Sequence, residues 1–302
     1  MTKNSINNTS SDLQVSAINI AGSTISTTTT NTNLNLSPNG TGKVSISGAY
    51  TLPSADGTSG QFLQTNGIGN LSFANTTSYS SLNVQVFLSS GTYTAPSNLS
   101  FAYIEVIGGG GGGGGKLATT AGTMSGSAGG LSGSYSAGLF SAVTIGASQV
   151  VTIGAGGNGG NGTIPIEGTS GGTSSFGSLI NATGGDHTIN GSLRSNNLLV
   201  TPSSATIGTG GSLNLPNAAS SYCFGLGNSP IFAIKSGCGG TSYYGGGGQG
   251  RVIVSSNSIA GTDGTGYGAG GSGAVGASVG VGAGFNGGNG ASGVVIITEY
   301  LL

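Results

Sequence analysis

The chain has 302 residues, of which 65 are glycine and only 35% are hydrophobic, with no tryptophan. Large side chains are therefore too few to fill an ordinary globular core. Cohesion has to come from hydrogen bonds between closely packed glycine segments and from apolar surface shared between copies of the chain. Six basic and seven acidic residues nearly balance, so the surface has no electrostatic attraction for nucleic acid.

Composition divides the chain near residue 90, because eight of the 65 glycines lie in the first 90 residues and the remaining 212 residues hold 57. No segment shows an apolar repeat of 3.6 residues, so we expect an all-β chain with very little α-helix. Residues 1–85 are predicted to form an intertwined β stalk that anchors the chain and forms trimers. Residues 86–302 are predicted to form a glycine-rich β domain.

Short strands with alternating apolar residues are expected within residues 11–47, around Leu13, Val15, Ala17, Leu34, Leu36, Val44 and Ile46. Strands this short need partners, and three identical chains wound together would supply them. The first 14 residues contain no apolar stretch, and no run in the chain is long enough to cross a membrane. We therefore expect synthesis in a cytoplasm, with neither a signal peptide nor membrane insertion.

Residues 60–73 predict a hairpin. A strand around Phe62 turns at Asn66-Gly67 and returns through Leu71. The Asn-Gly pair readily adopts the positive φ angles that a tight hairpin turn requires.

Two longer strands are expected at either end of the glycine-rich part. Alternating residues from Phe101 to Ile107 predict a strand that is buried on at least one face, and a similar strand runs from Val294 to Tyr300. Between them, glycine runs such as 108–115 lack Cβ atoms, so backbone can pack against backbone. Polyglycine-type extended helices with three residues per turn are one arrangement open to such runs, and β-structure is the other.

Four stretches, in order, resemble the glycine-rich domain of bacteriophage tail proteins. They are FLSSGTYTAPSNLSFAYIEVIGGGGGGGG from residue 87, FSAVTIGASQVVTIGAGGNGG at 140–160, GGTSSFG at 171–177 and GGNGASGVVIITEY at 287–300. Together they frame about two-thirds of the chain, and residues 178–245 carry this chain's own insertions. The hairpin at 60–73 is also similar to a recurrent element of tail fibres.

The resemblance implies a tail-fibre or adhesin subunit of a virion, made in the host cytoplasm. Such a subunit would form a homotrimer and contact other tail proteins through its N-terminal region. Its glycine-rich domain would bind a host surface glycan or an outer-membrane protein. The alternative is a purely structural fibre or capsid-decoration subunit without a receptor of its own.

Two glycine patterns have the spacing of cofactor-binding loops but lack the other residues and the helix that such loops require. Residues 110–116 follow a strand in the order of a phosphate-binding loop, but Leu117 stands where a hydroxyl would hold magnesium. Residues 154–159 have the glycine spacing of a dinucleotide fingerprint, but they open no helix and no acidic residue follows at the distance that a ribose needs. We expect structural roles for both patterns and no cofactor.

The remaining chemistry-bearing residues also form no recognisable centre. Asp186 and His187 are adjacent, but they have no positioned nucleophile beside them in the sequence. One histidine and two cysteines give no metal-ligand spacing. Cys223 and Cys238 could form a disulfide, although free buried thiols fit a cytoplasmic origin better. We therefore do not expect an enzyme.

Six aromatic residues of the C-terminal half lie among glycine and serine instead of in alternating strands: Tyr222, Phe224, Tyr243, Tyr244, Tyr267 and Phe285. Rigid rings carried by small neighbours supply much contact area at a low entropic cost, as in recognition loops. These six are the candidate receptor-binding residues. The alternative is that they fill a thin core between glycine layers.

Overall fold

A computed structural model describes residues 18–21, 24–27, 29–38, 41–76, 81–163, 167–188, 195–228, 231–254, 257–278 and 282–302. These residues form strands and one short helix, α1 (Ala142–Ile145), which confirms the predicted all-β fold class. No helix in the described part of the chain is long and apolar enough to cross a membrane. The chain divides into two compact units, Met1–Thr77 and Ser78–Leu302.

The N-terminal unit consists of small hairpins. Antiparallel pairs join β1 (Ile18–Ala21) to β2 (Thr24–Thr27), β3 (Ser45–Ile46) to β4 (Tyr50–Thr51), and β5 (Gln61–Thr65) to β6 (Leu71–Asn75). None of the described side chains between residues 29 and 76 is buried. The β3-β4 and β5-β6 hairpins therefore build no apolar core of their own.

The predicted strands of this unit are only partly present. The hairpin at 60–73 is confirmed as β5 and β6, but its turn is longer than a two-residue Asn-Gly turn: the Asn66 N–H donates to the Asn70 carbonyl at 3.1 Å. The Asn66 side chain stabilises this loop by accepting from the N–H groups of Ile68 and Asn70. Leu34 and Leu36 lie in no strand, which is a correction: no neighbouring strand pairs with that stretch. The expected strand around Leu13, Val15 and Ala17 lies outside the described residues.

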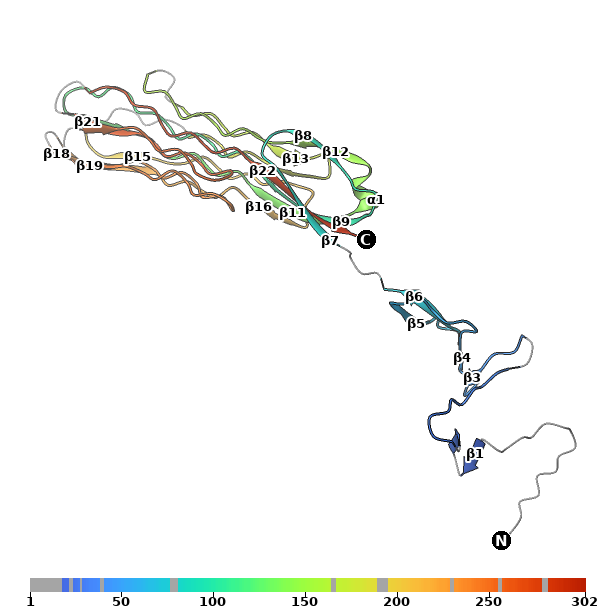
Figure 1. The fold of residues 1–302 in the computed structure, drawn as a ribbon. Helices are drawn as coiled ribbons and strands as arrows, with labels where there is room; N and C mark the ends of the chain where they lie inside the picture. The colour runs from blue at the N-terminus through green and yellow to red at the C-terminus, as the bar shows by residue number, and fades with distance from the viewer. Residues whose placement is uncertain are drawn as a thin grey trace, which may run out of the picture. The chain divides into compact units, whose positions relative to one another are not determined.

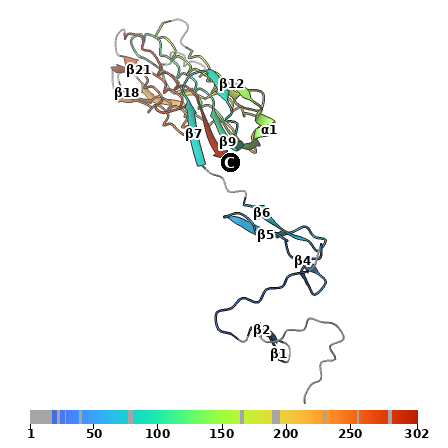
Figure 2. The ribbon, with the colours of Figure 1, turned by 45° about the vertical axis from the view of Figure 1, so that its right-hand side comes forward.

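The C-terminal unit begins with a β-sandwich, here called the entry sandwich, in which β7, β9 and β22 lie side by side close to the C-terminus (Figures 1 and 2). Its first sheet has the order β16-β11-β9-β22-β7, with β7 at Ser81–Phe87, β9 at Leu99–Ile107, β11 at Tyr135–Ser141, β16 at Leu213–Leu215 and β22 at Val294–Leu301. Its second sheet has the order β14-β13-β12-β8, with β8 at Gly91–Thr94, β12 at Ser148–Thr152, β13 at Ser174–Phe176 and β14 at Ile180–Ala182.

The core of the entry sandwich comes from alternating residues of these strands. In β9, Ala102, Ile104 and Val106 are buried, and Phe176 and Ile297 contribute from β13 and β22. The expected strands at 101–107 and 294–300 are thereby confirmed. The predicted domain boundary near residue 85 falls within β7, which pairs with β22 along its whole length and belongs to the C-terminal unit.

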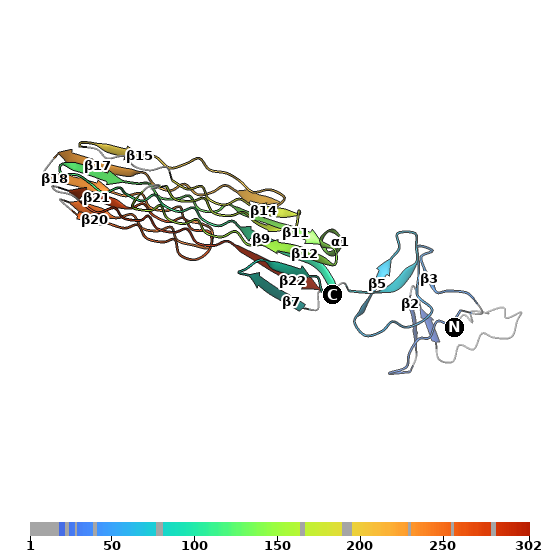
Figure 3. The ribbon, with the colours of Figure 1, turned by 90° about the horizontal axis from the view of Figure 1, so that it is seen from above.

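A second sandwich, here called the distal sandwich, lies at the other end of the C-terminal unit (Figures 1 and 3). One sheet has the order β15-β17-β18-β19, with β15 at Leu198–Val200, β17 at Cys223–Asn228, β18 at Ile231–Lys235 and β19 at Val252–Val254. The other has the order β10-β21-β20, with β10 at Thr123–Gly126, β20 at Asn257–Ile259 and β21 at Val275–Ser278. Met124, Cys223, Ile234 and Val275 are buried between them. Residues 178–245 supply β15, β17 and β18.

Long segments without strand pairing connect the two sandwiches (Figure 3), and their hydrogen bonds repeat every third residue. Within residues 108–116, the N–H groups of Gly108 and Gly111 donate to the carbonyls of Ser134 and Leu131, which belong to one neighbouring segment. Those of Gly109 and Gly112 donate to Gly172 and Thr169 in a second segment. Those of Gly110 and Gly113 donate to Ala291 and Gly288 in a third segment. The carbonyls accept from a second set of neighbours: Gly110 and Gly113 accept from Gly157 and Gly160, Gly111 and Gly114 accept from Gly271 and Ala274, and Gly109 accepts from Gly185.

This period of three identifies an extended helix of the polyproline II type. Residues 108–115 have three antiparallel neighbours, to which they donate, and three parallel neighbours, from which they accept. The glycine runs therefore form a lattice of polyglycine-type helices, here called the glycine lattice.

The spacing of the glycine lattice leaves no room for side chains where helices meet. A Cβ atom on Gly109 would lie 2.1 Å from the carbonyl oxygen of Ala155, and one on Gly112 would lie 1.9 Å from that of Asn158. Real Cβ atoms essentially never approach other atoms within 3.0 Å. The high glycine content thus follows from close backbone packing, and backbone hydrogen bonds replace the apolar core that the composition cannot supply.

Candidate functional site

The outer side of the β15-β17-β18-β19 sheet carries exposed apolar side chains. In β17, Cys223 and Gly225 face the core, whereas Phe224 and Leu226 are exposed. Phe224 therefore lies in an alternating strand, in contrast to the prediction. Tyr222, immediately before the strand, is 57% exposed. We define the distal face by the residues on this side of the sheet: Leu199, Tyr222, Phe224, Leu226, Ala233, Lys235, Val252 and Val254.

Strand register arranges the distal face in two rows across the sheet. One row consists of Leu199, Phe224, Lys235 and Val252, and the next of Leu226, Ala233 and Val254. Lys235 is the single charged member of the face. Contiguous apolar surface of this kind marks interaction sites in soluble proteins. The distal face can therefore bind another surface largely through apolar contact.

Three other candidate aromatics come together beside the entry sandwich. Tyr243 stacks on Tyr135 of β11 with ring centroids 4.4 Å apart, and Tyr244 meets Tyr243 edge-on with centroids 5.0 Å apart. Tyr244 also pairs with Tyr267 through an isolated β-bridge. We call Tyr135, Tyr243, Tyr244 and Tyr267 the tyrosine cluster.

Glu105 of β9 anchors the tyrosine cluster. The hydroxyls of Tyr135 and Tyr244 each donate to Glu105 Oε1 at 2.7 Å. Burial, and then these hydrogen bonds to the carboxylate, raise the pKa of Tyr135 and of Tyr244 well above the ordinary value. Both phenols therefore remain protonated donors, which fixes their rings in place.

The sixth candidate lies apart from both groups. Phe285 is half-buried, and Lys116 Nζ lies 5.7 Å from the centroid of its ring. The six aromatic candidates thus divide between the distal face, the tyrosine cluster and this single contact.

The family model for the glycine-rich domain matches residues 86–300. The chain belongs to the glycine-rich domain family. The match begins within β7 and ends within β22, so it includes both sandwiches and the glycine lattice. No curated protein matches the chain.

Residues 110–116 of this glycine-rich domain are not arranged as a phosphate-binding loop. The N–H groups of Gly110 and Gly113, which a phosphate would need, donate to Ala291 and Gly288. Lys116 is fully buried, and its Nζ donates to Ser258 Oγ at 2.9 Å. Residues 110–116 therefore have a structural role in the lattice.

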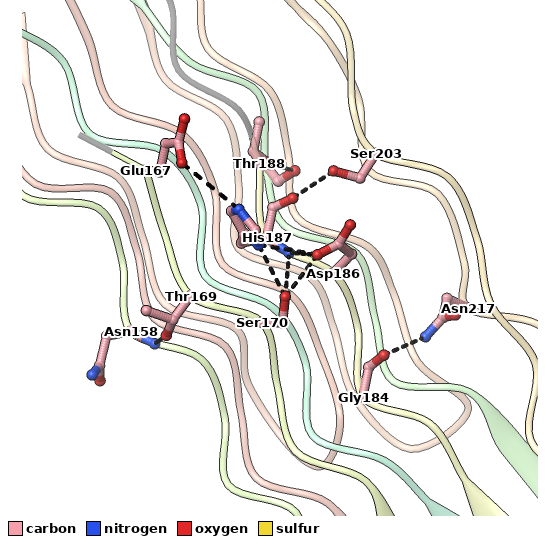
Figure 4. A network of polar contacts seen from close by, with 11 residues as sticks. Asn158, Glu167, Thr169, Ser170, Gly184, Asp186, His187, Thr188, Ser203 and Asn217 are labelled. Carbon is pink, nitrogen blue, oxygen red and sulfur yellow. Dashed lines mark hydrogen bonds and ion pairs between the residues drawn. The ribbon is translucent and has the colours of Figure 1, made fainter. Parts of the chain in front are cut away.

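A polar network in the glycine-rich domain brings four chemistry-bearing residues together (Figure 4). Ser170 Oγ donates to Asp186 Oδ1 at 2.7 Å and lies 2.9 Å from His187 Nδ1. Asp186 Oδ1 is 3.0 Å from the same ring nitrogen, and Glu167 Oε2 is 3.9 Å from His187 Nε2. The sequence pointed to Asp186 and His187, but it gave no indication of Ser170 or Glu167.

This network differs from a catalytic triad in its geometry. In a triad, the serine and the aspartate contact opposite nitrogens of the histidine ring, whereas Ser170 and Asp186 here share Nδ1. Burial would raise the pKa of Asp186, but hydrogen bonds from Ser170 and from the His187 N–H outweigh it, and the pKa lies below its usual value. The geometry suits a hydrogen-bonded junction between segments better than proton transfer from a serine.

The described part of the domain contains neither a metal centre nor a disulfide. No group of three or more His, Cys, Asp or Glu side chains that could hold a metal ion occurs among the described residues. Cys223 and Cys238 are free, as predicted. Burial raises the pKa of the Cys223 thiol to about 12. Cys238 is only half-buried, in contrast to the prediction, and its Sγ accepts from the Gly250 N–H.

Proposed function

We propose that this chain is a bacteriophage tail-fibre or adhesin subunit that attaches the virion to its host through the distal face. The observation that carries the proposal is the exposed apolar side of the β15-β17-β18-β19 sheet. Most of that sheet comes from residues 178–245, which lie outside the four stretches that resemble tail proteins. Receptor specificity is expected in segments of this kind, because function belongs to sites carried on a shared framework.

The glycine lattice supports this proposal mechanically. The chain enters the C-terminal unit near Ser81, in the entry sandwich, and the distal face lies at the other end of the same unit (Figure 1). At about 3.1 Å per residue, the nine residues from 108 to 116 span about 28 Å. A stiff spacer presents the face in one orientation, which lowers the entropic cost of binding.

The chemistry of the distal face favours a protein as the receptor. Its side chains are aliphatic or aromatic, with Lys235 as the one charge, and a polysaccharide would leave most of this apolar area unmatched. An outer-membrane protein with an exposed apolar and acidic patch fits better. Of the two receptor classes implied by the resemblance, we favour this one for the distal face.

We also propose that copies of the chain associate as a homotrimer and contact other tail proteins through the N-terminal region. The absence of buried side chains among the described residues from 29 to 76 supports this part of the proposal. Hairpins without a core gain stability when apolar surface is shared between chains.

Binding of the fluorescently labelled chain to a panel of bacterial strains tests the attachment proposal. We expect the wild-type chain to bind at least one strain, and the double substitution Phe224→Ser with Leu226→Ser to weaken binding at least tenfold. Val150→Ser is the matched control, since Val150 is an exposed apolar residue of β12 in the entry sandwich. Binding to no strain, or equal binding by both variants, would contradict the proposal.

A purely structural subunit is the second candidate, because the chain also carries an exposed apolar edge suited to assembly. Leu82, Val84 and Val86 of the edge strand β7 are each more than half exposed on the outer side of the five-stranded sheet. An exposed apolar edge strand is a template for pairing with another chain. The same edge would serve assembly in either candidate function.

A further inference from the structure

A cleft of about 230 Å³ opens beside the tyrosine cluster. Its lining combines the rings of Tyr135 and Tyr243, the apolar side chains of Leu215 and Pro216, and the hydroxyl-bearing residues Ser132 and Thr241. It belongs to the entry sandwich and the adjoining lattice, so it is separate from the distal face.

Tyr243 is exposed and yet held in place. Its ring is 60% exposed, although it stacks on Tyr135 and meets the edge of Tyr244. Glu105 ties both of those neighbours through their hydroxyls. An exposed aromatic ring with little freedom left to lose is a favourable platform for a ligand, because binding orders almost nothing further.

The lining of the cleft restricts the class of ligand. No charged residue lines it, so an anionic or cationic ligand would lose its hydration without gaining a partner. Glu105 does not line the cleft, and its Oε1 already accepts two hydrogen bonds. What remains is an aromatic surface with the exposed Thr241 beside it, which matches a ligand with a C–H face and hydroxyl groups at its rim.

We propose that this cleft binds a single neutral pyranose ring, seated against the exposed side of Tyr243. Its volume lies below the roughly 300–1,000 Å³ of pockets for drug-sized ligands, which fits one sugar ring better than an oligosaccharide. Because the ligand is one ring with few polar contacts, we expect a dissociation constant on the order of millimolar. The inference does not depend on attachment through the distal face.

Saturation-transfer NMR on the full chain with glucose, galactose and N-acetylglucosamine tests the inference. We expect at least one sugar to receive saturation, Tyr243→Ala to reduce the effect at least fivefold, and Tyr243→Phe to retain it, because the ring remains. Tyr222→Ala is the matched control, since Tyr222 is equally exposed but lies on the distal face.

Ala218→Leu is a second test that leaves the tyrosine cluster intact. Ala218 lines the cleft and is exposed, so a larger side chain there should fill the cleft without unfolding the domain, and sugar binding should be lost. Saturation transfer to none of the three sugars, an unchanged signal in Tyr243→Ala, or tighter binding of glucuronate than of glucose would each overturn the inference. The variant with Phe224→Ser and Leu226→Ser should bind sugar as the wild type does. A failure of sugar binding can therefore be distinguished from a failure of cell attachment through the distal face.

Discussion

The carbonyl oxygen of Ala269 lies 2.0 Å from the position that a Cβ atom on Gly110 would occupy. Gly110→Ala would therefore push a neighbouring helix of the glycine lattice out of place. We expect the free energy of unfolding to fall by about 3 kcal/mol or more, measured by guanidinium chloride denaturation. Gly91→Ala is the control, because its new methyl group would meet the Phe87 ring at an ordinary 3.7 Å. Equal stability of the two variants would contradict the lattice geometry.

Glu299 of β22 is fully buried and accepts hydrogen bonds from Asn83, Gln85 and Tyr93. Tyr93→Phe removes one donor from this buried carboxyl group while keeping the ring in the core. We expect a loss of about 1.5–3 kcal/mol in the free energy of unfolding, as for hydrogen bonds to charged groups. In Tyr222→Phe, which removes an exposed hydroxyl, the change should stay within about 0.5 kcal/mol. A similar small change for Tyr93→Phe would show that water replaces the lost hydroxyl.

Lys116 predicts a pH dependence of stability. Burial lowers its pKa from 10.5 to about 8, so between these values the unfolded chain binds more protons than the folded chain. The free energy of unfolding should therefore rise with pH across this window, by up to about 3 kcal/mol, and the penalty should be complete below pH 8.

Comparison of variants isolates the contribution of Lys116 to the pH dependence from that of any other group. Lys116→Met should abolish the rise between pH 8 and 10.5 relative to the wild type, whereas Lys43→Met, at an exposed lysine, should leave it unchanged. Chemical denaturation at several pH values measures the difference. A rise that persists in Lys116→Met would have to come from another group.

The edge strand β7 predicts self-association. The double substitution Val84→Lys with Val86→Lys would place two positive charges on the strand that a neighbouring chain would have to pair with. Association would then require these charges to lose their hydration and to approach the like charges of the neighbouring copy. We expect sedimentation velocity to show a trimer for the wild type, and the concentration at which it dissociates to rise at least tenfold in the double variant. Val150→Lys should behave like the wild type. A wild-type chain that remains monomeric at micromolar concentration would contradict the trimer proposal.

Two central strands of the entry sandwich, β9 and β22, could be predicted from sequence, whereas the partners of the glycine segments could not. Ala102, Ile104 and Val106 alternate with their neighbours, and that period of two identifies a strand with a buried face. Residues 108–115 contain nothing but glycine, so no side chain indicates which of the six neighbouring segments each one meets. The composition allowed polyglycine-type helices to be predicted as one possible arrangement. Which segments lie next to one another in the lattice is determined only by the fold.

Residues of the candidate sites could be predicted from sequence only where their residue type was itself the signal. Tyr222 and Phe224 were identified because they are aromatic residues among glycine and serine. Val252 and Val254 of the same distal face were missed, since alternation in a strand looks the same whether its outer side is covered or exposed. The partner of Tyr244, Glu105, is 139 residues away in the chain, and no local pattern indicates a contact over that separation.

Packing backbone against backbone also affects how the domain responds to temperature. Hydration of apolar groups raises the heat capacity of an unfolding chain, whereas hydration of peptide groups lowers it. Unfolding of residues 108–116 exposes mainly peptide groups, so the glycine lattice contributes little or negatively to the heat-capacity change. The curve of stability against temperature is accordingly flatter than for a protein with a conventional core, and cold denaturation is displaced to lower temperature.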